Sequence, residues 1–113
     1  MTKIRDIFPS YVYHGQFSRA TNLNREIKRE IGILSKLDTE GARWSRKNYA
    51  GGYSSYNSLT SLHQTSPNLG ELAQRLGSHV AKFVRKLEWD LLGGKIKMTT
   101  CWVNQMGFGT HHT

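Results

Sequence analysis

Residues 68–91, NLGELAQRLGSHVAKFVRKLEWDL, carry the clearest periodic pattern in the chain. Their apolar residues recur at steps of three, four or one, which places them on one face of a helix. The apolar set is Leu69, Leu72, Ala73, Leu76, Val80, Phe83, Val84, Leu87 and Leu91. The pattern predicts a long amphipathic helix that buries this stripe. His79 lies beside the stripe, where a half-buried structural histidine is favoured over a metal ligand.

Both ends of this predicted helix have local signals. The start is marked either by Ser66 with Pro67 or by Asn68 with Glu71 three residues later. A serine or asparagine can accept a hydrogen bond from a free backbone N–H, and proline suits the first helical position. The pair at 93–94, two glycines, predicts the end, because glycine adopts the left-handed conformation easily.

A second helix is predicted over residues 22–36. Four apolar residues recur there at spacings of four, four and three, which again defines one face. They are Leu23, Ile27, Ile31 and Leu34. Thr21 or Asn22 is the expected N-cap.

Two segments are predicted to be extended. Residues 7–14, IFPSYVYH, are aromatic and β-branched, and Pro9 favours an edge or a bend because it cannot donate to a strand ladder. Residues 95–106 alternate in the manner of a strand. The face expected to point inward carries Ile96, Met98, Thr100, Trp102, Asn104 and Met106; the other face carries Lys97, Thr99, Cys101, Val103 and Gln105. Asn104 on an apolar face needs a partner, either local backbone or a polar pocket.

The stretch from 41 to 66 shows neither a helical nor a strand period. Its centre, RWSRKNYAGGYSSY at 43–56, is aromatic, basic and rich in glycine. Long ordered connections are often functional. Two alternatives stay open: the segment shapes or covers a site, or its aromatic rings anchor it to the core. The candidate residues for such a lid are Asn48, Tyr49, Tyr53 and Tyr56.

The composition indicates a globular chain. It has 113 residues, 37% of them hydrophobic, and a net charge of +8. The 16 basic residues are spread along the chain and partly lie beside acidic ones, so solvated helix faces are favoured over a nucleic-acid site. Cys101 is alone, which predicts a small buried residue. No apolar run approaches the roughly 18 residues of a membrane span, and we expect a cytoplasmic protein without a membrane partner.

Motifs for hydrolysis and nucleotide binding are missing. The chain has no G-x-S-x-G and no G-x-x-x-x-G-K-[ST] stretch. Iron oxygenases use two histidines and a carboxylate, but His-x-Asp and His-x-Glu are absent as well. His111 and His112 are adjacent, so in an extended chain they point to opposite sides and do not readily share a metal.

Three stretches nevertheless resemble one family. They are WSRKNYAGGYSSY (44–56), LHQTSP (62–67) followed by the long helix, and MTTCWVNQM (98–106). In this order they are similar to bacterial 2-oxoglutarate and iron(II)-dependent oxygenases of the prolyl-hydroxylase type. The similarity extends over about residues 8–112. It implies a double-stranded β-helix, or jelly-roll, core and oxidative hydroxylation of a substrate that the resemblance does not name.

The resemblance also implies roles for single residues. Trp102 and Asn104 would line the pocket, and His111 and His112 would lie at its entrance. The family's iron ligands begin in a later H-x-H-P segment, which this chain does not reach before Thr113. We therefore expect 1–113 to form one domain, the N-terminal portion of an oxygenase. By itself this portion would be inactive and hold neither iron(II) nor 2-oxoglutarate.

The expected fold is α+β, with two main helices packed on the first strands of an incomplete jelly roll. A jelly roll needs about eight strands, so an open strand edge and an apolar patch should make the isolated chain marginally stable and prone to self-association. Two alternative functions remain. One is a non-functional gene remnant. The other is a small basic module that binds nucleic acid through Arg43, Arg46 and Lys47 interleaved with Trp44, Tyr49 and Tyr53.

Overall fold

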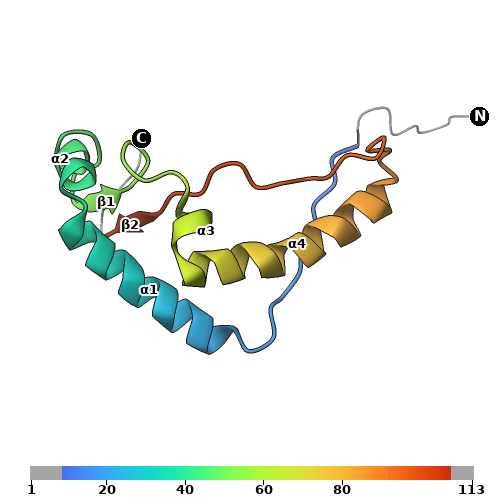
Figure 1. Ribbon diagram of the computed structural model, residues 1–113, viewed down its shortest axis with the longest axis horizontal. Helices are drawn as coiled ribbons and strands as arrows, with labels where there is room; N and C mark the ends of the chain where they lie inside the picture. The colour runs from blue at the N-terminus through green and yellow to red at the C-terminus, as the bar shows by residue number, and fades with distance from the viewer. Residues whose placement is uncertain (1–8, 108–113) are drawn as a thin grey trace, which may run out of the picture.

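The chain folds into four helices and a two-stranded antiparallel sheet, which confirms the α+β class (Figure 1). This computed structural model describes residues 9–107. The elements are α1 (Ala20–Leu37), α2 (Thr39–Asn48), β1 (Gly52–Ser54), α3 (Leu62–Thr65), α4 (Pro67–Leu87) and β2 (Asn104–Met106).

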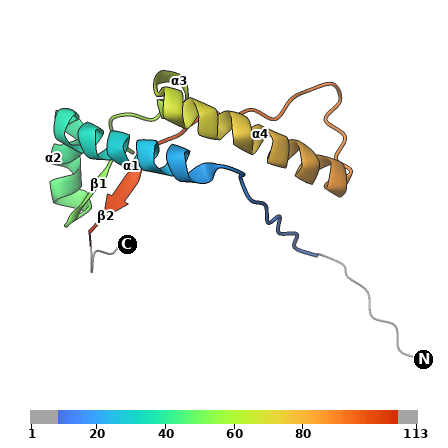
Figure 2. The same cartoon turned by 90° about the horizontal axis from the view of Figure 1, so that it is seen from below.

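The molecule is elongated. It measures 61 × 32 × 28 Å, and its radius of gyration is 18.4 Å, against about 13 Å for a compact domain of this length. One end, which we call the sheet lobe, gathers α2, α3, both strands and the adjoining ends of α1 and α4. From there α4 runs away to the opposite end (Figures 1 and 2).

Helix α4 starts as predicted and ends earlier than predicted. The Ser66 side chain accepts a hydrogen bond from the Leu69 N–H, and Pro67 takes the first helical position. The helix ends at Leu87, not at Leu91, because Glu88 turns left-handed with φ 58°. The N–H groups of residues 88 and 89 then bond to carbonyls of the last turn, which satisfies those acceptors. The glycine pair at 93–94 instead forms a later turn.

Helix α1 confirms the second predicted helix and extends it slightly. Leu23 is buried, and Ile27, Ile31 and Leu34 pack against the core from the same face. The predicted caps Thr21 and Asn22 are wrong, because both lie inside the helix. Helix α1 begins after Arg19, which adopts φ 53° and whose side chain makes no capping hydrogen bond.

The segment predicted to lack regular structure contains α2, β1 and α3. Asp38 explains α2, since its carboxylate accepts from the Gly41 N–H at 3.0 Å and Glu40 follows in the first turn. The sequence signal for α2 is therefore its capping residue Asp38, which lies just before the segment. The prediction missed this signal because the aromatic and glycine-rich stretch that follows shows no helical period.

The long predicted strand is mostly wrong. Only 104–106 form β2, paired with β1 in the register Gly52↔Met106, Tyr53↔Gln105 and Ser54↔Asn104. A single parallel bridge joins Cys101 to Ser61, while residues 95–100 pair with nothing within the described part of the chain. Residues 9–14, predicted as extended, likewise join no sheet.

Around Val103 the inward side is the reverse of the prediction, whereas Met98, expected inward, is half-buried and Gln105, expected outward, is exposed. Val103 is buried at 7% exposure, while Trp102 is 42% exposed and Asn104 and Met106 face outward. Val103 fits because it packs with Tyr53, Leu62 and Leu69 in the core. A more apolar face turns inward only where another layer covers it, and no such layer covers Trp102 among residues 9–107.

The main hydrophobic cluster lies in the sheet lobe, and Leu23 near the start of α1 is buried as well. Beyond the sheet lobe, the predicted α4 stripe is only partly covered: Phe83, Val84 and Leu87 are half-buried, and Val80 is exposed. A groove runs along this part of α4, with Ile96 on its other side. The molecule thus carries an open apolar surface at the end opposite to its core.

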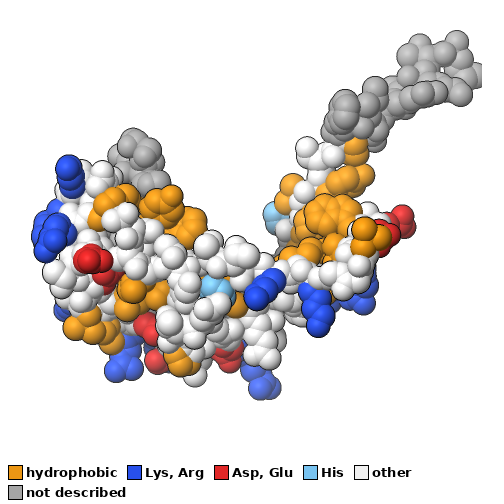
Figure 3. All heavy atoms as spheres, turned by 45° about the horizontal axis from the view of Figure 1, so that its top comes forward, with side chains coloured by type: hydrophobic (Ala, Val, Ile, Leu, Met, Phe, Trp, Pro, Cys, Tyr) orange, Lys and Arg blue, Asp and Glu red, His pale blue; other side chains and the backbone are white. Residues whose placement is uncertain are grey.

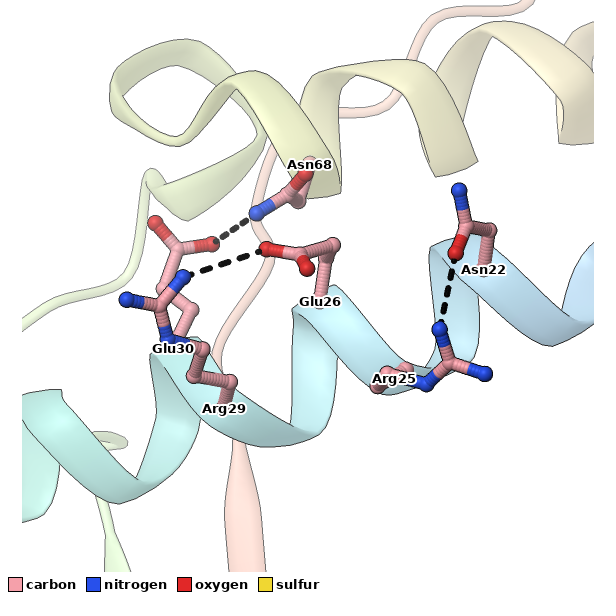
Figure 4. A network of polar contacts seen from close by, with 6 residues as sticks. All are labelled: Asn22, Arg25, Glu26, Arg29, Glu30 and Asn68. Carbon is pink, nitrogen blue, oxygen red and sulfur yellow. Dashed lines mark hydrogen bonds and ion pairs between the residues drawn. The ribbon is translucent and has the colours of Figure 1, made fainter.

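Polar contacts tie α1 to α4 near their closest approach (Figure 4). Glu30 of α1 accepts from the Ser66 hydroxyl and, at 3.4 Å, from the Asn68 amide. The other contacts in this view stay within α1: the pair Arg29–Glu26 and the bond from Arg25 to Asn22. Ser66 is therefore both a helix cap and a link between helices.

Replacing Ser66, the N-cap of α4, should lower the free energy of unfolding more than replacing Ser78 within α4. Ser66→Ala removes the cap of Leu69 and the bond to Glu30, which should cost about 1–2 kcal/mol. Ser78→Ala removes only an exposed bond to the Arg75 carbonyl and should cost less than about 0.5 kcal/mol. Urea unfolding followed by far-ultraviolet circular dichroism measures both. Equal losses would contradict both the capping and the linking role of Ser66.

Candidate functional site

Three segments of the chain meet in one place, which we call the strand junction: residues 52–55, 60–62 and 101–104. The Leu62 N–H donates to the Cys101 carbonyl at 3.1 Å, and the Cys101 N–H donates to the Thr60 carbonyl at 2.8 Å. Segments about 40–50 positions apart in the sequence are thereby joined through backbone bonds.

Ser55 closes the strand junction. Its N–H donates to the Val103 carbonyl at 3.0 Å, and its hydroxyl accepts from the Val103 N–H at 3.0 Å. The same hydroxyl donates to the Leu59 carbonyl at 2.9 Å. Ser55 is fully buried, so these bonds form away from competing water.

Two further serines lock α2 and β2 to β1. The Ser45 hydroxyl accepts from the Ser54 N–H at 2.9 Å and donates to the Ser54 carbonyl at 3.2 Å. The Ser54 hydroxyl donates to the Asn104 side-chain oxygen at 2.7 Å. A Cβ at Gly52 would lie 2.6 Å from the Tyr49 ring and 2.7 Å from the Gln105 carbonyl, so only glycine allows this approach.

Near the strand junction, the carboxylate of Asp38 accepts three hydrogen bonds. Asp38 accepts from the Gly41 N–H, from the Tyr53 hydroxyl at 2.7 Å and from the Ser58 hydroxyl. Burial alone would raise the pKa of Asp38, but the hydrogen bonds from Ser58, Tyr53 and Gly41 outweigh it and lower the pKa. Burial, together with the bond to Asp38 and its negative charge, raises the pKa of Tyr53.

The candidate lid residues divide into two groups. Tyr49 and Tyr53 are 2% and 6% exposed, so they anchor the segment to the core. Asn48 is exposed, and its amide donates to the Trp44 carbonyl at 3.0 Å. Tyr56 is 54% exposed.

The candidate pocket residues also divide. Trp102 and Asn104 lie on the outward side of the chain, and Asn104 is held by Ser54 across the strand pair. This partner is a side chain, neither of the two expected for it. His111 and His112 lie outside the described residues.

An exposed aromatic row appears that the sequence did not predict. The Tyr56 ring lies between Trp44 and Trp102, with centroid separations of 6.0 and 5.1 Å. We call these three residues the aromatic row. Trp102 is 46 positions from Tyr56 in sequence, and nothing local indicates that they meet.

The described residues do not form an iron site. Within 9–107, no three His, Cys, Asp or Glu side chains gather so that they could hold a metal ion. Both ring nitrogens of His63 are buried without a partner, and the nearby Cys101 is a free thiol. Burial raises the pKa of Cys101, although a backbone contact with His63 opposes this, so the thiol stays protonated near neutral pH.

Comparison of the chain with models of known protein families, with curated proteins and with solved structures finds no match. None of the helices between residues 9 and 107 is both long enough and apolar enough to cross a membrane.

The Asp38 cluster predicts a specific response to acid. The folded protein keeps this carboxylate ionised below the ordinary pKa of 3.8. The resulting stabilisation is present above that value and is lost as the pH falls through the lower folded pKa. Asp38→Asn should reduce stability near neutral pH by about 1–3 kcal/mol and flatten the decline below pH 4.

Glu40→Gln is the matched control, because it removes an equal charge from an exposed position in the same first turn. Its unfolding free energy should follow the wild-type pH profile. Urea titrations at several pH values measure both variants. An unchanged acid profile for Asp38→Asn would contradict the role given to this cluster.

Proposed function

We propose that this chain forms the N-terminal part of a 2-oxoglutarate and iron(II)-dependent oxygenase domain. One observation carries the proposal: the third stretch that resembles this family lies about 40–50 positions after the other two and bonds to both of them at the strand junction. In the proposed domain, β1 and β2 are early strands of a jelly roll, and α1 and α4 cover its sheet.

The open surfaces support the same proposal. Among residues 9–107, β1 and β2 pair only with each other. The outer edge of β1 is occupied by Ser45 and Tyr49, which bond to Ser54 and Gly52, so the free edge in this part of the chain is that of β2. The far half of α4 leaves Val80 at 37% and the neighbouring Ile96 at 50% exposure. A further strand would pair with the free edge of β2, and further chain would cover the apolar groove, which burial of apolar area favours.

The chemistry of such a domain needs groups that residues 9–107 do not provide. Iron(II) with 2-oxoglutarate, when bound, supplies oxidative hydroxylation of a C–H bond with decarboxylation of the 2-oxoglutarate. No ligand set in the described chain fits the metal, so we derive no catalytic step through it. The proposed role of this portion is positional: Ser54 fixes the side chain of Asn104, and Trp102 forms an aromatic wall beside it.

A protein that extends beyond Thr113 with the family's H-x-H-P segment should form succinate from 2-oxoglutarate when iron(II) is present. The 113-residue chain alone should form none and should bind no stoichiometric iron(II) in a calorimetric titration. Succinate is measured by mass spectrometry, with iron omitted as the control. Stoichiometric iron uptake by the chain alone, or a longer protein that forms no succinate, would contradict the proposal.

The coding sequence downstream of codon 113 gives a separate test. The proposal expects an in-frame H-x-H-P segment just after codon 113, followed by sequence with strand-like alternation. A stop codon followed by unrelated sequence would favour the gene remnant instead.

A further inference from the structure

The aromatic row leaves ring faces open to solvent. Tyr56 is 54% exposed and Trp102 is 42% exposed, while Trp44 is half-buried. The neighbouring rings are inclined by 52° and 66° instead of lying parallel. In such tilted contacts the edge of one ring covers part of one face of its neighbour, and the exposed fractions show that much of the ring surface of Tyr56 and Trp102 still faces solvent. An exposed aromatic face is a surface on which a planar group can stack.

Positive charge lies beside this row. Arg43, Arg46 and Lys47 of α2 stand three and four positions apart, which places them on neighbouring parts of one helical face. Arg43 and Lys47 line a surface hollow together with Trp44 of the row. The ion pairs of residues 9–107 are Arg29–Glu26 and Arg75–Glu71, so these three cations are not neutralised by a carboxylate.

Figure 3 shows one face of the molecule. Hydrophobic side chains lie on the sheet lobe and, in a larger group, toward the opposite end, and Lys and Arg side chains lie along the margins of both parts. Only Glu40 among the residues that line the hollow carries a negative charge. The local charge is therefore positive, in keeping with the net charge of +8 for the whole chain.

We propose that the aromatic row and the three cations of α2 bind single-stranded nucleic acid. Unpaired bases would stack on Trp102 and Tyr56, and backbone phosphates would contact Arg43, Arg46 and Lys47. This pairing of stacking surfaces with cations is the physical basis of single-strand binding. A duplex keeps its bases stacked inside and offers no free base face to the row.

The site differs from the nucleic-acid module considered from sequence. Tyr49 and Tyr53, which were expected to stack, are buried in the sheet lobe. Tyr56 and Trp102 take their place, and Trp102 comes from a segment far along the chain. A second copy of this chain suits the surface less well, since both copies would bring the same excess of positive charge. The inference uses only described residues and does not depend on the proposed oxygenase domain.

Fluorescence anisotropy with a labelled oligothymidylate of about 10 nucleotides tests the proposal directly. Binding should appear at low salt, weaken as salt is raised and exceed the binding of a duplex of equal length. With up to three phosphate contacts, the logarithm of the association constant should fall with log[salt] at a slope of about −2. No binding at low salt, or equal binding of the duplex, would overturn the proposal.

Matched variants locate the site. Trp102→Ala and Tyr56→Ala should each weaken binding about fivefold or more, whereas Tyr56→Phe keeps the ring and should bind as the wild type does. Trp89→Ala is the control, because Trp89 is exposed at the opposite end of the molecule, where it lines a separate hollow together with Tyr11 and Phe83. Equal affinity of Trp102→Ala and Trp89→Ala would overturn the assignment.

A matched pair of lysine variants tests the contribution of the cations of α2 to binding. Lys47→Gln should make the salt slope shallower by about 0.7. Lys28→Gln removes the same charge from an exposed position on α1 and should leave the slope unchanged. Circular dichroism of every variant checks that the fold is retained. Equal slopes for the two lysine variants would contradict a phosphate contact at α2.

Discussion

The reciprocal bonding of Ser55 and Val103 is the constraint on which the rest of the structure depends. Ser55 is fully buried, and its N–H and hydroxyl hold both backbone groups of Val103. This fixes which side of the chain faces the core, so Val103 turns inward and Trp102 turns outward. The antiparallel register of β1 and β2 and the exposed aromatic row both follow from that choice. An unsatisfied buried hydroxyl would be costly, which makes the arrangement specific.

The two long helices could be predicted because their information is local. The apolar spacing of α1 and α4 and the Ser66–Pro67 start require no distant partner. The strand residues could not be predicted in the same way. Whether Val103 or Trp102 faces inward depends on Ser55, which lies 48 positions earlier. The missed helix α2 has a local cause, since its cap Asp38 precedes a segment whose aromatic and glycine content obscures the helical pattern.

The residues of the candidate site also divide into those that the sequence could identify and those that it could not. The sequence indicated Tyr56 through the aromatic stretch 41–66, and Trp102 and Asn104 through the family resemblance; all three lie on the exposed side of the sheet lobe. It also grouped Tyr49 and Tyr53 with them, although these two rings belong to the core. Tyr53 and Tyr56 are thus close in sequence but differ in environment, since the Tyr53 ring is buried in the core and Tyr56 is exposed. The distinction arises because β1 is short and turns its tyrosine inward, just before the chain brings Tyr56 to the surface.

Amide hydrogen exchange followed by nuclear magnetic resonance tests the central claim, that the distant stretches bond at the strand junction. The N–H groups of Ser55, Leu62, Cys101 and Val103 donate to acceptors across this junction. The account predicts that these four amides exchange together and slowly, because they open only when the junction opens. Residues 95–100, which pair with nothing in the described chain, should exchange much faster. Fast exchange at Cys101 and Val103, equal to that of residues 95–100, would contradict the account.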